Sequence, residues 1–504
     1  MAASIESSHS ATQPLLDLHP DLFTVLCLND GFRLALDHIT VRNLFLVCRR
    51  AQRLLPSKVA RFHDWCKGAG LCRPDGLLQI SLTPSEMMVL AAHYCGQEAT
   101  DRSWIISLSD QGNIAASYFL GRVLQADTVY RTDITRPELE AMGNQMYRLF
   151  ESCAQAGHSK ARYQIAECYR KGYGVDQDDA KAAEIYRGLA VRGLCPAQVA
   201  LGRYYENGEG VEQDLDAAVE WFTKAINQGS RGARPRVAFI RGWFSFIGHG
   251  VEQSDTDAFN RWQELAAELA DPDTKRTVVH MIGWMHYLGR GTPQNKQKGV
   301  KMIRENAADD FIFGEDQCLA SAWSVTDKSS AARKFFKLCR MGSERDWLCK
   351  QLMATCLLHG VGVERNHAAA AEAFAELANQ GYSPSQYLLG HCYANGKGVP
   401  RDDSKAFSWY SKAAAQDDSY GQVGVGRCYE TGSGVPRDAI KAIEWFRKSA
   451  VQGNSFGQHK LGSHYRDGSG VAQDLDAALY WYRKSADQGN VMGRRDLGRL
   501  QNPW

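Results

Sequence analysis

A Gly-x-Gly pair recurs eight times along this chain, and its spacing restricts what the chain can fold into. The gaps between successive first glycines are 36, 40, 41, 71, 36, 36 and 36 residues, so five of the seven equal 36 or nearly a multiple of it. A fixed period of this length is typical of solenoids, in which one structural unit is repeated and stacked. The first glycines of the pairs are Gly172, Gly208, Gly248, Gly289, Gly360, Gly396, Gly432 and Gly468.

The bulk properties agree with a stacked array. At 504 residues one compact core is not expected, but repeats bury their apolar faces against their neighbours and need none. A net charge of +2 gives no electrostatic reason to expect a nucleic-acid partner. The first residues lack the basic and apolar regions of a secretory signal, and no apolar run is long enough to insert into a membrane. We therefore expect a cytoplasmic protein.

The residues before each glycine pair predict a helix, here called helix A. Six residues before the first glycine, every unit has Ala or Gly, and three residues before it Tyr recurs. Spacings of three and four place these residues on one helical face. The small residue lets a partner helix approach closely, despite the low helix propensity of glycine. The small residues are Ala166, Gly202, Gly242, Gly283, Ala354, Gly390, Gly426 and Gly462.

The residues after each glycine pair predict a second helix, helix B. Glycine accepts the left-handed conformation that ends helix A, and an Asp, Asn or Ser shortly afterwards is an N-cap for helix B. An aromatic pair such as Trp409 and Tyr410 then recurs at one helical phase, which favours a core role over a cofactor stack. The glycines follow a helix and not a strand, so they are not a dinucleotide-binding loop. The sequence predicts an all-α fold of antiparallel helix pairs.

The residues 201–222 and 461–482 show the pattern in full: Leu-Gly, a Tyr three residues later, Gly-x-Gly-Val and then an aromatic pair. This pattern resembles the Sel-1-like repeat, a relative of the tetratricopeptide repeat. The resemblance implies a right-handed superhelical solenoid, here of about eleven helix pairs. It also implies a non-enzymatic scaffold or adaptor whose concave surface binds partner proteins or peptides.

The repeat pattern divides the chain into segments. We expect a disordered tail (1–14), a small helical N-terminal domain (15–80) and divergent lead-in repeats (81–156). Sel-1-like repeats follow (157–308 and 346–490), interrupted by one degenerate repeat (309–345), and a C-terminal capping half-repeat ends the array (491–504).

The irregular central units suggest one partner-binding site. Five and two residues before the glycine pair, most units have polar or small residues, but two adjacent units have Trp243 with Phe246 and Trp284 with Tyr287. An exposed aromatic cluster would be typical of an interface. The alternative is a buried cluster, because Arg241 takes the place of a core Leu and a rotated helix would bury the rings.

Charged residues on helix A suggest a second site. Arg203 and Arg427, together with Arg170 and Arg466, alternate with glutamates along the stack. One interpretation is a solvated, mutually paired ladder, in which each pair contributes little stability. The other is a polar groove for a charged peptide.

The N-terminal segment allows two interpretations. Leu18, Pro20 and the run from Leu44 to Leu55 resemble an F-box, although the part between them is longer than that pattern has. The resemblance implies a substrate receptor of a ubiquitin ligase within residues 15–65. The alternative is a helical cap on the first repeat.

No signature of an enzyme accompanies the repeats. The sequence has no zinc-protease, phosphate-loop or nucleophile-elbow motif, and we expect no cofactor and no metal site. Its 14 cysteines include several in one apolar slot of helix A, which favours buried free thiols. Some cysteine-rich relatives are described as β-lactamases, and a hydrolase is the remaining alternative, but those relatives pair two cysteines in each unit.

Overall fold

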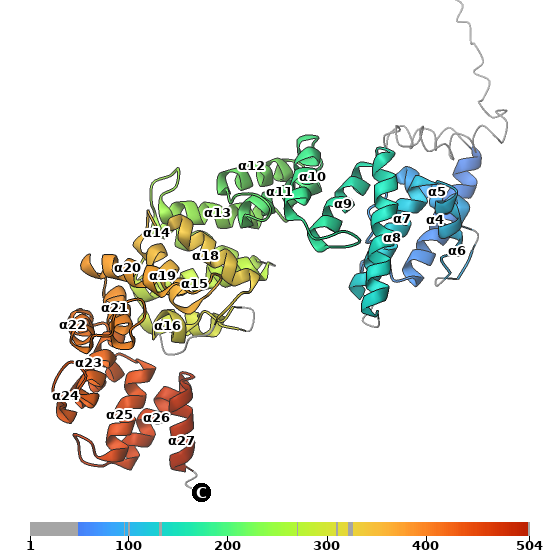
Figure 1. Cartoon of the computed structure of the whole chain (residues 1–504). Coiled ribbons are helices and arrows are strands. Elements are labelled where there is room, and N and C mark those ends of the chain that lie inside the picture. The colour runs from blue at the N-terminus through green and yellow to red at the C-terminus, as the bar shows by residue number, and fades with distance from the viewer. Residues whose placement is uncertain are drawn as a thin grey trace, which may run out of the picture. The chain divides into compact units, whose positions relative to one another are not determined.

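The computed structural model describes residues 49–501 apart from residues 95, 99–100, 131–133, 270, 309–310 and 321–325. These residues form 24 helices (Figure 1), and their β-pairing is limited to isolated bridges between single residues. The predicted all-α fold is confirmed. Among the described helices, none has the length and hydropathy needed to cross a bilayer.

The chain divides into two compact units, and the first ends at Ser230. The helices of this unit are α4 (Arg49–Gly68), α5 (Pro84–His93), α6 (Ser103–Asp110), α7 (Ile114–Tyr130), α8 (Arg136–Gln155), α9 (Ser159–Lys171), α10 (Asp179–Val191), α11 (Cys195–Asn207) and α12 (Leu215–Asn227).

The second unit begins at Arg231. Its helices are α13 (Arg234–Ile247), α14 (Asp255–Glu268), α15 (Pro272–Leu288), α16 (Lys296–Asn306), α17 (Glu315–Cys318), α18 (Ser330–Gly342), α19 (Trp347–His359), α20 (His367–Asn379), α21 (Ser383–Asn395), α22 (Asp403–Ala415), α23 (Ser419–Thr431), α24 (Ala439–Val451), α25 (Ser455–Asp467), α26 (Leu475–Asp487) and α27 (Val491–Gln501).

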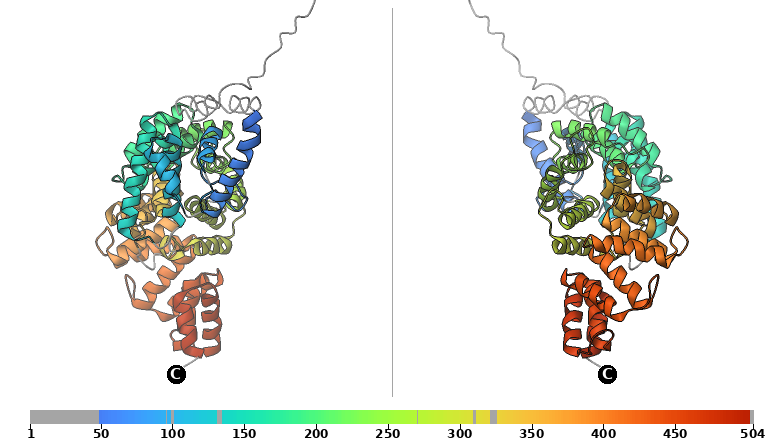
Figure 2. Two further views of the ribbon diagram at one scale, coloured as in Figure 1. Left: turned by 90° about the vertical axis from the view of Figure 1, so that its right-hand side faces the viewer. Right: turned by 90° about the vertical axis from the view of Figure 1, so that its left-hand side faces the viewer.

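Within each unit the helices follow one another as the predicted A and B helices. Taken in order from α5 to α26 they make eleven successive pairs, and α27 follows as a single helix. Hairpins such as α11 with α12 and α25 with α26 pack along their length. Figure 2 shows α25, α26 and α27 side by side in red.

The caps explain why the helices begin and end where the sequence predicts. The first glycine of each pair is the C-cap of helix A, in a left-handed conformation with φ between 63° and 80°. The predicted N-cap side chains accept a hydrogen bond from the backbone N–H three residues later, which satisfies a free helix donor. These N-caps are Asp178, Asp214, Ser254, Asn295, Asn366, Asp402, Asp438 and Asp474.

In several repeats the small residue of helix A faces an aromatic ring of helix B, whereas Gly283 faces Ile303. A Cβ added at Gly426 would lie 2.6 Å from Cε1 of Phe446, and one at Gly202 would lie 2.7 Å from Cε1 of Phe222. Any larger residue would collide with the ring, so the absence of a side chain sets how closely the two helices approach.

Pairs of glutamines join the two helices of a single repeat. In each case a glutamine at the end of helix B donates from Nε2 to Oε1 of a glutamine on helix A, 30 residues earlier, at 2.7–2.9 Å. We call this series the glutamine ladder. Its rungs are Gln228 to Gln198, Gln416 to Gln386, Gln452 to Gln422 and Gln488 to Gln458.

The segment 309–345 departs from the repeat. Its first helix, α17, has four residues, and its second, α18, packs against α15. A Cβ at Gly342 of α18 would also lie 3.1 Å from Cγ2 of Ile247, so α18 contacts α13 as well. This segment therefore covers two earlier A helices.

The end of α4 belongs to the first hydrophobic core. Phe62, Trp65 and Cys66 are buried together with Ile105 of α6 and Phe119 of α7. Residues 1–48, with the predicted tail and most of the F-box-like pattern, lie outside the described residues, so that interpretation and the helical cap remain predictions.

Candidate protein-binding surface

The structure places the six predicted site residues on four A helices. Arg203 lies on α11 and Arg427 on α23, and both side chains are exposed. The four aromatic residues lie on α13 and α15. Only the two arginines are accessible to a partner.

The predicted exposed aromatic patch is wrong. Trp243, Phe246 and Trp284 are fully buried, and Tyr287 is 4% exposed. The Trp243 ring packs on Trp262 of α14 with 5.8 Å between ring centroids. These residues are part of the core of the second unit.

The rings are buried because other segments cover them, and not because the helices rotate. A Cβ at Gly242 would lie 2.5 Å from Nε1 of Trp262, so α13 keeps the usual phase towards helix B. Arg241 is exposed, and α18 packs against α15. The guanidinium carbon of Arg290 lies 4.3 Å from the Phe246 ring centroid and covers that ring.

In the first unit, the A helices α9 and α11 and the B helix α10 line an open pocket. Its volume is about 380 Å³. Tyrosines and charged side chains dominate the wall. The principal lining residues are Tyr163, Glu167, Arg170, Tyr186, Arg203 and Tyr204.

One carboxylate of this pocket is fully engaged. Glu167 accepts hydrogen bonds from Nη2 of Arg170 and from the Tyr186 hydroxyl, both at 2.6 Å. Burial would raise the pKa of Glu167, but the bonds from Arg170 and Tyr186 outweigh it and the pKa is lowered. Glu167 is therefore an anion at neutral pH whose charge is balanced by Arg170.

Arg203 is the unpaired cation of the pocket, whose wall also includes the carboxylate of Glu209. Among the described residues, its side chain makes no hydrogen bond or ion pair, whereas Arg170 is held by Glu167. The Tyr204 hydroxyl beside it donates to Asp179 at 3.2 Å. The pocket thus offers an exposed guanidinium between aromatic rings, which suits a carboxylate.

Arg427 has the same position in its own repeat. Its side chain is likewise exposed and unpaired among the described residues of the second unit. The paired-ladder interpretation therefore describes Arg170 and Glu167, but it does not describe Arg203 or Arg427.

A larger open pocket of about 800 Å³ in the second unit was not predicted from the sequence. Arg290 bridges Asp255 at 2.6 Å and Asp346 at 2.8 Å in its wall. Trp347 and Tyr382 stack there with 4.3 Å between centroids. Arg290 stands between two glycines of a repeat loop, but nothing in the sequence shows that residues 255 and 346 meet.

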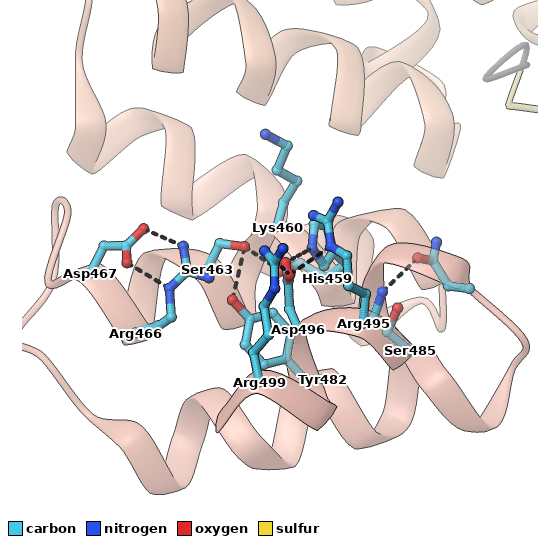
Figure 3. Close-up of polar contacts among 12 residues, drawn as sticks. His459, Lys460, Ser463, Arg466, Asp467, Tyr482, Ser485, Arg495, Asp496 and Arg499 are labelled. Carbon is cyan, nitrogen blue, oxygen red and sulfur yellow. Dashed lines mark hydrogen bonds and ion pairs between the residues drawn. The ribbon is translucent and has the colours of Figure 1, made fainter. Parts of the chain in front are cut away.

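A polar cluster on α25, α26 and α27 is shown in Figure 3. The His459 ring lies 2.9 Å from a carboxylate oxygen of Asp496, and both side chains are buried. Arg495 pairs with the same carboxylate at 3.0 Å. The Tyr482 hydroxyl donates to Oγ of Ser463 at 3.1 Å. The serine does not contact the imidazole in these bonds, so this is no nucleophilic triad.

The cysteine slot of helix A is buried. Desolvation raises the pKa of Cys168 and of Cys392 to about 12, so these thiols are protonated at neutral pH. Across the part of the chain that the structure describes, no three His, Cys, Asp or Glu side chains are grouped to hold a metal ion.

Comparison with known families agrees with this architecture. Segments within the chain match the model of the Sel1 repeat at residues 159–187, 195–230, 279–305, 351–382, 383–418, 419–454 and 455–490. The chain contains seven Sel1 repeats. Arg203 lies in the second of them and Arg427 in the sixth. The unmatched stretch between residues 306 and 350 includes α17 and α18.

Solved structures of repeat proteins show similarity as well, while no curated protein sequence matches. The antigen c5321 of uropathogenic Escherichia coli is 24% identical, with 83% of this chain and 88% of that chain covered and a TM-score of 0.34. A Sel1 repeat protein of Oxalobacter formigenes is 23% identical over 79% and 89%, with a TM-score of 0.27. Yeast Tom70 is 13% identical over 94% and 88%, with a TM-score of 0.28.

Proposed function

We propose that this Sel1-repeat protein is a non-enzymatic adaptor that binds an acidic segment of a partner protein along α9 and α11. The unpaired guanidinium of Arg203 in the pocket of the first unit carries this proposal. Stacked repeats present extended binding surfaces, and arginine binds carboxylates through two parallel hydrogen bonds.

One tyrosine of the pocket supports the same role. Tyr163 lines the pocket and is half-buried, whereas Tyr186 and Tyr204 are buried in the core beneath it. Tyrosine gives contact area with few rotatable bonds, so Tyr163 can order a bound segment at low entropic cost. Glu167 does not compete for Arg203, because Arg170 and Tyr186 already hold it.

Proximity labelling with the full-length protein tests the proposal. We expect Arg203→Glu to lose a defined set of labelled partners, because the carboxylate of the partner then meets a negative charge. Arg192→Glu is the matched control, since Arg192 is an exposed arginine on the C-cap of α10 and its reversal changes the net charge equally.

Two results would contradict the proposal. One is an unchanged set of partners for Arg203→Glu at an unchanged melting temperature. The other is hydrolysis of a chromogenic β-lactam by the purified protein, which would contradict the non-enzymatic assignment and support the hydrolase alternative.

A further inference from the structure

The helix pair of α19 and α20 departs from its neighbours at residues that line the pocket of about 800 Å³ in the second unit. The A helices that follow, α21, α23 and α25, begin with a serine, whereas α19 begins with Trp347. The N-caps of α23 and α25 are Asp418 and Asn454, whereas the N-cap of α21 is Tyr382, whose side chain makes no cap hydrogen bond. Two large rings thus replace small polar side chains at this pocket.

These two rings form the aromatic part of the pocket wall. Trp347 and Tyr382 stack with 4.3 Å between ring centroids and 15° between ring planes. Both side chains are half-buried, whereas the ring of Phe446 in a later repeat is fully buried. The stack therefore presents aromatic surface to the pocket and does not belong to the core that the other repeats share.

The glutamine ladder is interrupted in the same helix pair. Gln380 has the position of the donating glutamine, but Lys350 stands 30 residues earlier, where helix A otherwise has the accepting glutamine. Lys350 instead pairs with Glu376 of α20 at 2.6 Å. The Gln380 side chain is exposed, lines the pocket, and makes no hydrogen bond with another described residue. Its amide group therefore keeps both donors and an acceptor for a ligand.

The charge on helix B is reversed at this pocket. Glu376 lies four residues before the glutamine that ends α20. The same position carries a lysine over a tryptophan ring in four other repeats, as Lys224, Lys412, Lys448 and Lys484. The pair of α19 and α20 thus replaces a cation by an anion at the surface of the array.

Carboxylates outnumber cations in the pocket wall by four to three. Arg290 is held between two carboxylates, Lys350 pairs with Glu376, and Arg345 donates to the main-chain oxygen of Gly248 at 3.1 Å. The Glu344 side chain is exposed, and it makes no hydrogen bond or ion pair among the described residues. The excess of negative charge attracts a cationic group of a partner and repels an acidic one. The charged lining residues are Asp255, Glu344, Asp346 and Glu376 against Arg290, Arg345 and Lys350.

A guanidinium group fits both the aromatic and the acidic part of this wall. It is planar and weakly hydrated, so it stacks on aromatic faces, and it binds a carboxylate through two parallel hydrogen bonds. The chain itself contains one example beside the pocket. The guanidinium carbon of Arg290 lies 4.3 Å from the Phe246 ring centroid, while its nitrogens bind Asp255 and Asp346.

We propose that this pocket binds an arginine side chain in an extended, basic segment of a partner protein. The guanidinium stacks on Trp347 and Tyr382 and binds Glu344, while Gln380 binds a main-chain peptide group next to the arginine. The segment is extended because a helix already uses its own main-chain donors and acceptors. This site prefers the opposite charge to the Arg203 pocket and does not depend on the function of that pocket.

Fluorine NMR of the full-length protein, with fluorotryptophan in place of tryptophan, tests the site. The probe is N-acetyl-arginine N-methylamide, and Trp347→Phe identifies the Trp347 signal. We expect the probe to shift this signal saturably. The Trp409 signal should not move, because Trp409 is also half-buried but lies under Lys412. The same compound with citrulline, which has the shape of arginine without its charge, should bind about tenfold more weakly, and the glutamate compound more weakly still.

Matched variants identify the residues that bind the probe. Glu344→Gln should weaken binding about tenfold at an unchanged melting temperature, because it removes the charge that faces the guanidinium. Glu364→Gln is the control, since Glu364 is an exposed glutamate of the second unit that does not line the pocket, and it should leave the dissociation constant unchanged. Arg203→Glu should leave it unchanged too.

Three results would overturn this proposal. They are a Trp347 signal that the arginine compound does not shift, equal or tighter binding of the citrulline or glutamate compound, and equal weakening by Glu344→Gln and Glu364→Gln. Because the probe reports on the second unit alone, none of these results bears on the Arg203 pocket.

Discussion

A single glycine has opposite consequences in two helices of this protein, depending on what faces it. Gly426 lies under Phe446, where a methyl group would be 2.6 Å from the ring, whereas Gly498 faces open space. Both are in A helices at the same repeat position. The contrast separates the packing role of glycine from its intrinsic cost in a helix.

Alanine at these two positions should shift stability in opposite directions. Gly426→Ala forces an overpacked contact and should cost about 1–3 kcal/mol. Gly498→Ala removes only the backbone entropy of glycine and should stabilise α27 by about 0.5–1 kcal/mol. Urea denaturation followed by circular dichroism measures both. Equal effects of the two substitutions would contradict the packing role.

His280 is a second residue whose surroundings decide its behaviour. It is fully buried on α15, and the Nε1 of Trp284 donates to it at 3.2 Å. Desolvation lowers the pKa of His280 to about 3, so the imidazole is neutral in the folded protein at neutral pH.

The second unit should therefore lose stability as the pH falls below about 6.5, because the unfolded chain binds a proton at His280 that the folded chain does not. His280→Phe removes this contribution, which amounts to about 1.4 kcal/mol per pH unit. Compared with the native chain, the variant should gain about 2 kcal/mol between pH 7 and pH 5 in urea denaturation. If the difference in unfolding free energy between the variant and the native chain is the same at pH 7 and pH 5, then His280 does not bind a proton on unfolding.

At the scale of helices, the caps were predictable from the sequence because they depend on residues close together in the chain. Each predicted N-cap binds an amide three residues away, and each C-cap glycine is left-handed. The buried aromatic residues were not predictable in this way. The helix that carries Trp284 and Tyr287, α15, packs against α18, which begins more than one repeat later in the sequence, and the repeat pattern contains no information on that contact.

The cap of α20 gives a test at this scale. The Oδ1 of Asn366 accepts from the N–H of Ala369 at 3.0 Å. Asn366→Ala leaves that donor without a protein acceptor and should cost about 1 kcal/mol, while Asn366→Asp keeps an acceptor and should cost little. The denaturation midpoints of the two variants test this prediction. Equal losses of stability in both would mean that the side-chain hydrogen bond of Asn366 is not the source of the stability.

Both units contain contacts between residues far apart in the sequence. In the first unit, the His158 ring lies 2.6 Å from Glu86 across 72 residues, whereas α10, α11 and α12 pack mainly on their neighbours. In the second, the hydroxyl of Tyr420 donates to Glu315 across 105 residues, and Arg290 binds Asp346 across 56. Long-range contacts couple distant helices, so opening of the second unit should be more cooperative than opening of α10 to α12.

Hydrogen exchange of the whole chain should show this difference. Phe222→Ala removes the ring that seats on Gly202 and should cost about 3–5 kcal/mol locally. We expect faster amide exchange from α9 to α12 and unchanged exchange from α21 to α26. Faster exchange throughout both units would contradict nearest-neighbour stability.

The glutamine ladder has a consequence for the conditions under which the two helices of a repeat stay together. Its rungs join neutral amides, at 2.7–2.9 Å, and contain no ionisable group. Debye screening acts on exposed charges and leaves uncharged donors and acceptors almost untouched. The contact between the two helices of each of these repeats should therefore keep its geometry at high salt, whereas arginine-mediated contacts with a partner weaken. High salt would then release the partner and leave these helix pairs intact.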